Sequence, residues 1–415
     1  MAIVRPFRAV RPAREYADQV ISLPYDVMNR EEAAKMAEGN PYSFLHVCRA
    51  EIDLPHVEDP YSEPVYARAK KNINDLLENE ILIRDGEPML YIYKQVMDGR
   101  SQTGIVGCVS IDEYMNNTIK KHEFTRLEKE LDRIKHFDAC NTNTEPVFLT
   151  YRDDKRLRTL IEGWMNGHAP EYDFTTKDGI GHALWTITDQ GVVRSLTYLF
   201  SEIDALYIAD GHHRSASAVK VGQKRREEHP DYTGDEEFNY FMAVIFPDAD
   251  LKIFDYNRVV KDLNGYSKEE FLAKIAEKFI VEPVDSQNGP YRPEAKHTFG
   301  MYLADRWYKL TAKAEYVCEE DVIKCLDVSI LQDHLLQPVL GIEDPRTDKR
   351  IDFVGGIRGP GELERRVGLD MAVAFALHPV MISDLLAVAD KGMVMPPKST
   401  WFEPKLGSGL FMHEL

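Results

Sequence analysis

The segment Leu206–Arg214, which reads LYIADGHHR, restricts the fold of this chain more than any other. Its first four residues are mostly apolar and predict a buried strand, and the small residues from Ser215 onward predict a helix that ends near Glu228. Between them, Gly211 permits a positive φ or a close approach of the backbone to a ligand. The segment therefore predicts a strand, a polar turn and a helix within a mixed α/β fold.

The polar turn contains four side chains that can bind an anion or move a proton: Asp210, His212, His213 and Arg214. The N-terminus of the following helix adds unpaired N–H groups and a positive dipole end, which both favour an anion. Because three polar residues in a row exceed what a helix cap needs, we favour a phosphate or carboxylate site over a capped loop with solvent-facing histidines. We expect His213 and Arg214 to face a cleft, so that alanine at either position weakens ligand binding with little effect on stability.

The amino-acid composition restricts location and partners. The chain has 415 residues, enough for two or three domains, and a net charge of -18 from 69 acidic and 51 basic residues. An acidic chain repels polyanions, so we expect no nucleic-acid partner. The five cysteines form no CxxC pair, which fits a reducing cytoplasm rather than a disulfide framework. Since no signal peptide or membrane-spanning apolar run is present, we expect a cytoplasmic protein without a membrane partner.

The standard motifs for nucleotides and for several kinds of catalysis are missing from the sequence. There is no G-x-x-x-x-G-K-[ST] loop and no G-x-G-x-x-G after a strand. There is also no H-E-x-x-H zinc helix and no G-x-S-x-G nucleophile elbow. A nucleotide would therefore be bound by an uncommon arrangement.

A second polar cluster, KKHEFTR at residues 120–126, follows an apolar β stretch and precedes a helix. Its residues His122 and Glu123 are therefore expected at a strand end, facing the same pocket as Asp210. A carboxylate near bound phosphate can deprotonate a hydroxyl or hold Mg²⁺. Residue types alone slightly favour the alternative, a solvated and charged helix start.

The C-terminal segment 395–410, MPPKSTWFEPKLGSGL, contains basic groups beside hydroxyls, a combination that suits phosphate. Lys398 follows two prolines, which stiffen the chain and reduce the cost of ordering it. We expect the segment to fold back to the polar pocket, where Lys398 supplies positive charge to bound phosphate. A proline-rich surface turn explains Ser399, Thr400 and Lys405 equally well.

Three other segments are weaker candidates. RPF at 5–7 and LPYDV at 23–27 precede the polar clusters, and a plain turn explains Asp26 in the second. Residues 352–366 are rich in glycine without Walker spacing, and we expect a loop near a site there.

Helical and strand patterns alternate along the chain. A β-hairpin is predicted from Met89 to Ile111, with its turn at Asp98–Gly99. Residues 284–296 are the best linker, and they divide the chain into an α/β region 1–283 with both polar clusters and an α/β region 297–415 with the MPPKST segment. Further helices are expected at 63–83, 127–139, 155–165, 191–203, 267–279, 328–340 and 382–391, and further strands at 146–151, 240–246, 252–260 and 300–310.

The motifs RPF, LPYDV, KHEFT, ADGHHR, DVSILQDHLLQPVLGI and MPPKSTWFEPK, in this order, resemble those of a bacterial and archaeal domain family of unknown function, from residue 5 to about 410. ADGHHR alone is also similar to the DGHHR element of the ParB/sulfiredoxin-like superfamily, which includes the free serine kinases. There the element binds nucleotide phosphate, and the kinases use a separate glutamate as base. The resemblance implies a ParB/sulfiredoxin-like nucleotide-binding core with a phosphate site at Asp210, His212, His213 and Arg214. His212 stands where the catalytic cysteine of a sulfiredoxin would be, which disfavours that activity.

The resemblance implies an enzyme that transfers phosphate between ATP or ADP and a small hydroxylated metabolite, with free L-serine as the first candidate. Phosphoryl transfer depends mostly on positioning and charge neutralisation. With water as acceptor, the same site would be a phosphatase. In this hypothesis Glu123, Asp210 and His212 are catalytic, Asp210 also holds Mg²⁺, and the nucleotide is bound by His122, His213, Arg214 and Lys398.

The alternative is a non-catalytic nucleotide sensor or a ParB-like regulatory protein. Such a protein would contact DNA through Arg5, Arg8, Arg11 and Arg14, which would share a face if that stretch were helical. Prolines at positions 6 and 12 oppose that helix. The sequence leaves the oligomeric state open.

Overall fold

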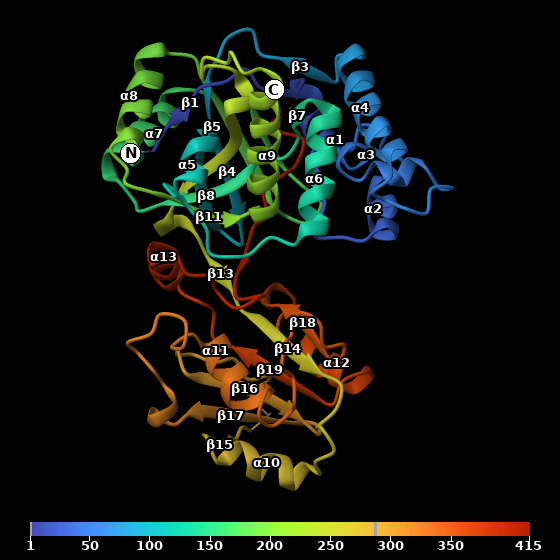
Figure 1. Ribbon diagram of the computed structural model, residues 1–415, viewed down its shortest axis with the longest axis vertical. Helices are drawn as coiled ribbons and strands as arrows, with labels where there is room; N and C mark the ends of the chain where they lie inside the picture. Colours follow the sequence, from blue (N-terminus) through green and yellow to red (C-terminus); the bar gives the residue numbers. More distant parts are fainter. Residues whose placement is uncertain (1, 286–288) are drawn as a thin grey trace. The chain divides into compact units, whose positions relative to one another are not determined.

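The structure, a computed structural model, describes residues 2–285 and 289–415 (Figure 1). It contains two compact units, one made of residues 2–251 and 404–415 and the other of Lys252–Glu403. Each unit combines helices with β-sheet, so the predicted mixed α/β fold is confirmed. Among the described residues, no helix is both long enough and apolar enough to cross a membrane.

The described part of the first unit is built on a nine-stranded mixed sheet. Its order is β6 (Ile119–Lys120), β11 (Leu206–Asp210), β8 (Val147–Tyr151), β12 (Tyr240–Pro247), β5 (Arg100–Ser110), β4 (Leu90–Met97), β10 (Gly181–Ile187) and β9 (Tyr172–Thr175), with β1 (Val4–Arg5) beside β5. Most neighbours are antiparallel, but β6 runs parallel to β11 and β8 runs parallel to β12. The predicted hairpin is confirmed, since β4 and β5 join through Asp98–Gly99 with positive φ at both turn residues.

The main core of this unit joins the sheet to its helices. Leu90 and Ile92, two residues apart on β4, face the same side of the sheet. They belong to one buried cluster with Leu196 and Phe200 of α8 (Gln190–Ser201). Three more predicted helices of this unit are present as α4 (Glu63–Glu78), α6 (Leu127–Cys140) and α7 (Lys155–Gly167), and two of the second unit as α10 (Lys268–Ala276) and α13 (Ile382–Asp390). Helix α4 stops early because Leu82–Arg84 form strand β3.

The predicted strand, turn and helix around ADGHHR are present, but the helix starts earlier than expected. Helix α9 runs over His212–Glu228 rather than from Ser215, because Gly211 has a φ of +93° and serves as the N-cap residue. The Ser215 amide donates to the Gly211 carbonyl at 2.9 Å, which closes the first helical turn. The turn is therefore one glycine, and the three polar residues after it lie in the first turn of α9.

Small residues allow α9 to pack closely on its neighbours. The Ser217 hydroxyl is buried and donates to the carbonyl of Glu130 in α6 at 2.9 Å. At Gly222, a Cβ atom would lie 2.4 Å from the Phe238 carbonyl, so only glycine fits there. This packing holds α9 close to α6 and to Phe238.

The second unit contains a six-stranded sheet in the order β15 (Phe279–Pro283), β17 (Arg306–Ala312), β16 (Thr298–Leu303), β19 (Val373–Leu377), β14 (Tyr256–Val260) and β18 (Ile351–Gly355). Three local predictions are wrong here. The single strand expected at 300–310 is a hairpin, because Ala304 and Asp305 turn with positive φ. Residues 352–366 form β18 and helix α12 (Gly361–Leu369) rather than a loop, and the helix expected at 328–340 is a short α11 (Asp327–Leu331) followed by a π-helical turn at Gln332–Leu336.

The boundaries between the two compact units do not coincide with the linker predicted at 284–296. Strand β14 pairs with β18 and β19, so the second unit begins before that linker. Residues 286–288 of the predicted linker lie outside the described residues. The division into 1–283 and 297–415 stays a prediction for the independently folding parts of the chain.

Candidate functional site

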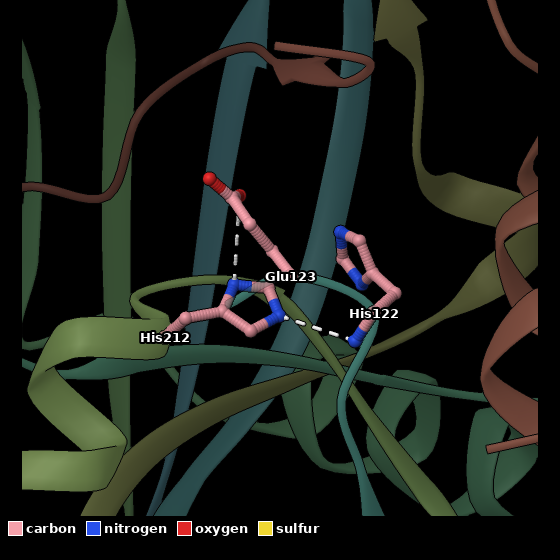
Figure 2. Close-up of side chains that lie close together, drawn as sticks. All are labelled: His122, Glu123 and His212. Carbon is pink, nitrogen blue, oxygen red and sulfur yellow. Dashed lines mark hydrogen bonds and ion pairs between the residues drawn. The ribbon is translucent and has the colours of Figure 1, made fainter. Parts of the chain in front are cut away.

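The two polar clusters meet at one edge of the sheet in the first unit. Because β6 and β11 are parallel neighbours, the segments that follow them leave the sheet at the same edge. The amide of His122 donates to Nε2 of His212 at 3.4 Å, and Nδ1 of His212 lies 4.0 Å from Oε2 of Glu123 (Figure 2). A second link joins the clusters, since the Arg126 amide donates to Nε2 of His213 at 3.0 Å.

His122 and His212 are buried, and their rings meet edge to face with centroids 4.5 Å apart. Burial lowers the pKa of His122 to about 4, and burial together with the neighbouring His122 lowers the pKa of His212 well below its usual value. Both imidazoles are therefore neutral at neutral pH. Both ring nitrogens of His122 are buried without a hydrogen-bond partner among the described residues. Buried polar groups are normally paired, so a ligand at this imidazole would supply the missing bond.

The hydrogen bonds assign a tautomer to His212. Its Nε2 accepts from the His122 amide, so the proton of the neutral ring belongs on Nδ1. That proton points toward the Glu123 carboxylate, which is 45% exposed and reachable by a substrate. His212 can therefore orient Glu123 by donating to it, as carboxylates and histidines pair in many sites.

Asp210, at the end of β11, is held by two cations and a backbone amide. Its Oδ2 lies 2.8 Å from Nζ of Lys405, its Oδ1 accepts from the Gly211 amide at 2.7 Å, and Nη2 of Arg214 lies 3.9 Å away. Although burial opposes the charge, Lys405 and Arg214 keep the pKa of Asp210 well below its usual range. Asp210 is therefore a carboxylate at every physiological pH.

The side chain of Arg214, which was expected to face a cleft, is almost completely buried. Nη1 donates to the Pro146 carbonyl at 2.5 Å, while Nε is buried without a hydrogen-bond partner among the described residues. Nearby acids, including Asp210 and Glu145, outweigh the effect of burial and raise its pKa. A Cβ atom at position 211 would lie 3.1 Å from Nε, so the turn needs glycine for space as well as for its positive φ.

A buried layer of charge beneath the corner was missed by sequence reasoning. The Glu145 carboxylate accepts from the Ser408 hydroxyl at 2.7 Å and from the Tyr25 amide at 3.3 Å. Nη1 of Arg133 lies 3.6 Å from its other oxygen, and the Arg133 guanidinium covers the Tyr25 ring at 4.0 Å. Burial raises the pKa of Glu145. The LPYDV motif forms a turn at Tyr25 and Asp26, as expected, and through Tyr25 it also supports the corner.

Of the two lysines in the C-terminal motif, Lys405 belongs to the first unit and Lys398 to the second. Lys398 has a φ of +57° and its Nζ lies 5.4 Å from the centroid of the Tyr256 ring. Its predicted role at a phosphate stays a prediction. Sequence reasoning selected Lys398 because hydroxyl residues follow it, whereas Lys405 has no such neighbours and carries no local signal.

Within the described part of the chain, His122, Glu123 and His212 form a group that could hold a metal ion, with ligand atoms all within 4.8 Å of one another. Two imidazoles and one carboxylate suit a transition metal better than Mg²⁺. Coordination through Nδ1 of His212 would move its proton to Nε2, which faces the His122 amide. The Mg²⁺ predicted at Asp210 would also have to share the carboxylate with Lys405. The contacts thus favour hydrogen bonding over metal coordination at both places.

A groove lies elsewhere in the first unit. It has a volume of about 710 Å³ and runs between α7 and α8, where Trp164 and His168 stack with ring centroids 3.8 Å apart. None of the predicted site residues lines it. We base the site on the side-chain chemistry at the β11–α9 corner, because the two polar clusters of the sequence meet there and not in this groove.

Replacing the buried His182 should make the stability of the chain less dependent on pH. Burial lowers the pKa of His182 from 6.5 to about 4, so the unfolded chain binds one more proton between these values. This group therefore destabilises the fold as the pH falls from 6.5 to 4, by up to about 1.4 kcal/mol per pH unit. Burial raises the pKa values of Glu113 and Asp327 to about 7, so these two groups stabilise the fold as the pH falls. The pH dependence of the wild type alone therefore does not isolate the effect of His182.

The measurement is urea unfolding of the wild type and His182→Gln between pH 7 and pH 5. The difference in stability between the two proteins should shrink as the pH falls, because glutamine does not titrate. Parallel pH profiles would contradict a neutral, buried His182.

A family model described as "Protein of unknown function (DUF1015)" matches residues 4–329 of the chain. No curated protein matches it. Similar solved structures include a free serine kinase in complex with AMP (14% identity, 74% of this chain and 92% of that chain, TM-score 0.36). Others are a conserved hypothetical protein from Pyrococcus furiosus (14%, 74% and 95%, TM-score 0.35) and SbnI with a C-terminal truncation from Staphylococcus aureus (11%, 74% and 87%, TM-score 0.39). At these values, similarity does not establish a shared function.

Proposed function

The chain belongs to DUF1015, a family of proteins of unknown function, and we propose that it is a nucleotide-dependent phosphotransferase acting on a small hydroxylated metabolite. The main support for this proposal is the position of the Glu123 carboxylate beside Nδ1 of His212. His212 itself lies in the first turn of α9. A carboxylate can take the proton of a hydroxyl, and a helix N-terminus can bind phosphoryl oxygens. Phosphoryl transfer needs little more than such positioning and charge neutralisation.

Each residue has one role in this proposal. Glu123 takes the proton of the acceptor hydroxyl, and His212 orients its carboxylate through Nδ1–H. The phosphates of ATP or ADP are bound by the helix N-terminus together with His122, His213 and Arg214. The unpartnered Nε of Arg214 and the single ring N–H of neutral His122 support these assignments, because a phosphate oxygen would accept from them.

Mg²⁺ enters this proposal with the nucleotide rather than as a resident ion. The site predicted at Asp210 does not fit Mg²⁺ as it stands, because an ammonium group lies 2.8 Å from the carboxylate. We therefore assign no step to a metal held by Asp210. The ParB/sulfiredoxin-like relationship, free L-serine as first substrate, the phosphatase direction and a cytoplasmic location all belong to the same proposal.

The alternative, a DNA-binding regulatory protein, requires that the arginine-containing N-terminal segment be helical, and this segment is not a helix. Arg5 and Arg11 lie in or beside short strands rather than on a helix. Arg11 is buried and pairs with Asp85 at 2.9 Å, while Arg5 donates to the Asp235 carbonyl at 2.7 Å. Together with the net charge of -18, these contacts predict no measurable DNA binding at physiological salt.

The experiment that tests the proposal is incubation of the full chain with Mg²⁺, ATP or ADP, and hydroxylated metabolites including L-serine, L-threonine and glycerate. Mass spectrometry should detect a phosphorylated product that depends on both nucleotide and acceptor. Release of inorganic phosphate from a phosphorylated metabolite without nucleotide would identify the phosphatase direction. Absence of any phosphoryl transfer or release across the panel, together with absence of nucleotide binding, would overturn the proposal.

His213→Ala is expected to weaken ADP binding with little change in thermal stability. His213 is half-buried, its Nε2 accepts from the Arg126 amide, and its Nδ1 then carries a proton for a phosphate oxygen. Loss of one hydrogen bond to a charged group costs about 1.5–3 kcal/mol, or roughly ten- to a hundredfold in affinity. Calorimetric titration beside a melting curve measures both, with exposed His56→Ala as the control. A lower melting temperature with unchanged affinity would make His213 a structural residue.

A further inference from the structure

The ion pair of Lys405 with Asp210 is the strongest unassigned feature near the proposed phosphate site. Nζ of Lys405 lies 2.8 Å from Oδ2 of Asp210, and the lysine side chain is only 12% exposed. Surface ion pairs contribute little, but a partly buried ammonium group must be held by a partner to remain charged. The chain therefore keeps a cation at the strand end that leads into the helix N-terminus.

The backbone around Lys405 is fixed by hydrogen bonds within the first unit. Its carbonyl accepts from the Gln95 amide group in β4 at 2.8 Å. Ser408, three residues later, exchanges backbone hydrogen bonds with Ser22 at 2.9 and 3.1 Å and donates its hydroxyl to Glu145. An ammonium group on such an anchored segment is preorganised, so little entropy is lost when it meets a ligand.

The other contacts of Asp210 indicate what this carboxylate does. Its Oδ1 accepts from the Gly211 amide, and the Arg214 guanidinium lies 3.9 Å away, so cationic or N–H donors surround it. A carboxylate in such surroundings orients cations better than it ligates Mg²⁺, which would be repelled by both. An ammonium group donates three hydrogen bonds, so Lys405 can bind a phosphoryl oxygen while it keeps its bond to Asp210.

We propose that Lys405 binds the terminal phosphoryl group of the nucleotide, and that Asp210 is a positioning residue that holds Lys405 in place. The inference rests on the proposed function and deepens it, because it names the cation that neutralises the phosphates. Lys405 stays protonated throughout and gives up no proton. It replaces the role predicted for Asp210 as a metal ligand.

Titration calorimetry of the full chain with AMP, ADP and pyrophosphate, each with Mg²⁺ and with EDTA, tests the inference. Lys405→Met should weaken ADP and pyrophosphate at least tenfold and AMP less than threefold, because AMP lacks the terminal group. Lys405→Arg, which keeps the charge, should recover part of the ADP affinity. Lys220→Met is the matched control, since Lys220 lies on α9 and pairs with Glu130 at 2.8 Å, away from Asp210. If Lys405→Met fails to fold, Lys405→Arg decides, because its bulkier planar group should still weaken ADP at least threefold.

The variant Asp210→Asn separates a positioning role from a metal role. If Asp210 positions Lys405, its substitution weakens ADP equally with Mg²⁺ and with EDTA, and has no further effect in the Lys405→Met background. If Asp210 binds Mg²⁺, its effect appears only with Mg²⁺ and adds to that of Lys405→Met, which overturns the inference.

The results distinguish this inference from the proposed function. ADP binding that is unchanged in Lys405→Met overturns the inference and leaves the phosphotransferase proposal standing. Pyrophosphate binding that depends on Lys405, in a chain that binds no nucleotide, supports the anion-binding lysine and overturns the nucleotide proposal. A wild type that binds neither ADP nor pyrophosphate overturns both.

Discussion

Glu123→Gln is expected to reduce phosphoryl transfer by a factor of about 10²–10⁴ while nucleotide affinity changes little. Glutamine keeps the size of glutamate and a side-chain oxygen that can lie near Nδ1 of His212, which is 4.0 Å from the carboxylate. It cannot take the proton of the acceptor hydroxyl. The loss should therefore appear in the turnover number rather than in nucleotide binding.

The measurement compares initial rates of product formation, followed by mass spectrometry, with calorimetric affinity for ADP in the same preparations. Glu128→Gln is the matched control, because Glu128 is an exposed acid in the first turn of α6 and shares the local charge. Equal rates for the Glu123 variant, the control and the wild type would remove Glu123 from the reaction. It would then be the solvated helix-start residue that residue types alone suggest.

His212→Ala should then reveal whether His212 acts through Glu123. Alanine removes the Nδ1 proton donor from the carboxylate, so the rate should fall in the wild-type background but hardly at all beside Glu123→Gln. Such non-additivity is the expected signature of two residues that work as one unit. Additive losses would mean that His212 contributes separately, for example by binding phosphate.

The meeting of the two polar clusters could be anticipated from sequence because the signal is local on both sides. Each cluster directly follows an apolar stretch, and polar groups at strand ends tend to converge when the strands are neighbours. The sequence does not show that β6 is the parallel neighbour of β11, since that pairing depends on the whole sheet order. The sequence could therefore predict that the two polar clusters lie close together, but the distances and contacts between them follow only from the fold.

The burial of Arg214 could not be anticipated, because most of its partners are far away in the chain, although Asp210 is only four residues away. Its hydrogen-bond acceptor is the carbonyl of Pro146, and its charge is balanced by acids that include Glu145. Local sequence therefore indicates only a polar corner. The same limit applies to Lys405, whose partner Asp210 is far away along the chain.

Secondary structure was mispredicted where turns lack their usual residues. The hairpin between β16 and β17 turns through Ala304 and Asp305, both at positive φ, where Asn-Gly or Asp-Gly is expected. The start of α9 was placed too late because histidines and an arginine suggested a polar loop. Gly211 supplies the reversal alone, which frees the following residues to enter the helix.

Arg214→Ala is expected to destabilise the first unit by about 3–5 kcal/mol, in contrast to the small effect on stability that its place in the sequence predicts. Its removal leaves the buried Glu145 carboxylate and Asp210 without a guanidinium that now lies beside them. It also frees the Pro146 carbonyl, which now accepts from Nη1. Both losses leave buried polar groups without partners, and such losses are more costly than the removal of a surface pair.

Urea unfolding measures the effect, with the exposed Arg126→Ala on the same edge as control. Arg214→Lys should lie between the wild type and Arg214→Ala, because an ammonium group keeps the charge but cannot reproduce the planar hydrogen-bonding fork. If Arg214→Ala and Arg126→Ala unfold alike, the acids around the corner are satisfied without the guanidinium. The unpartnered Nε would then be the only reason to retain Arg214, and its role would be confined to the ligand.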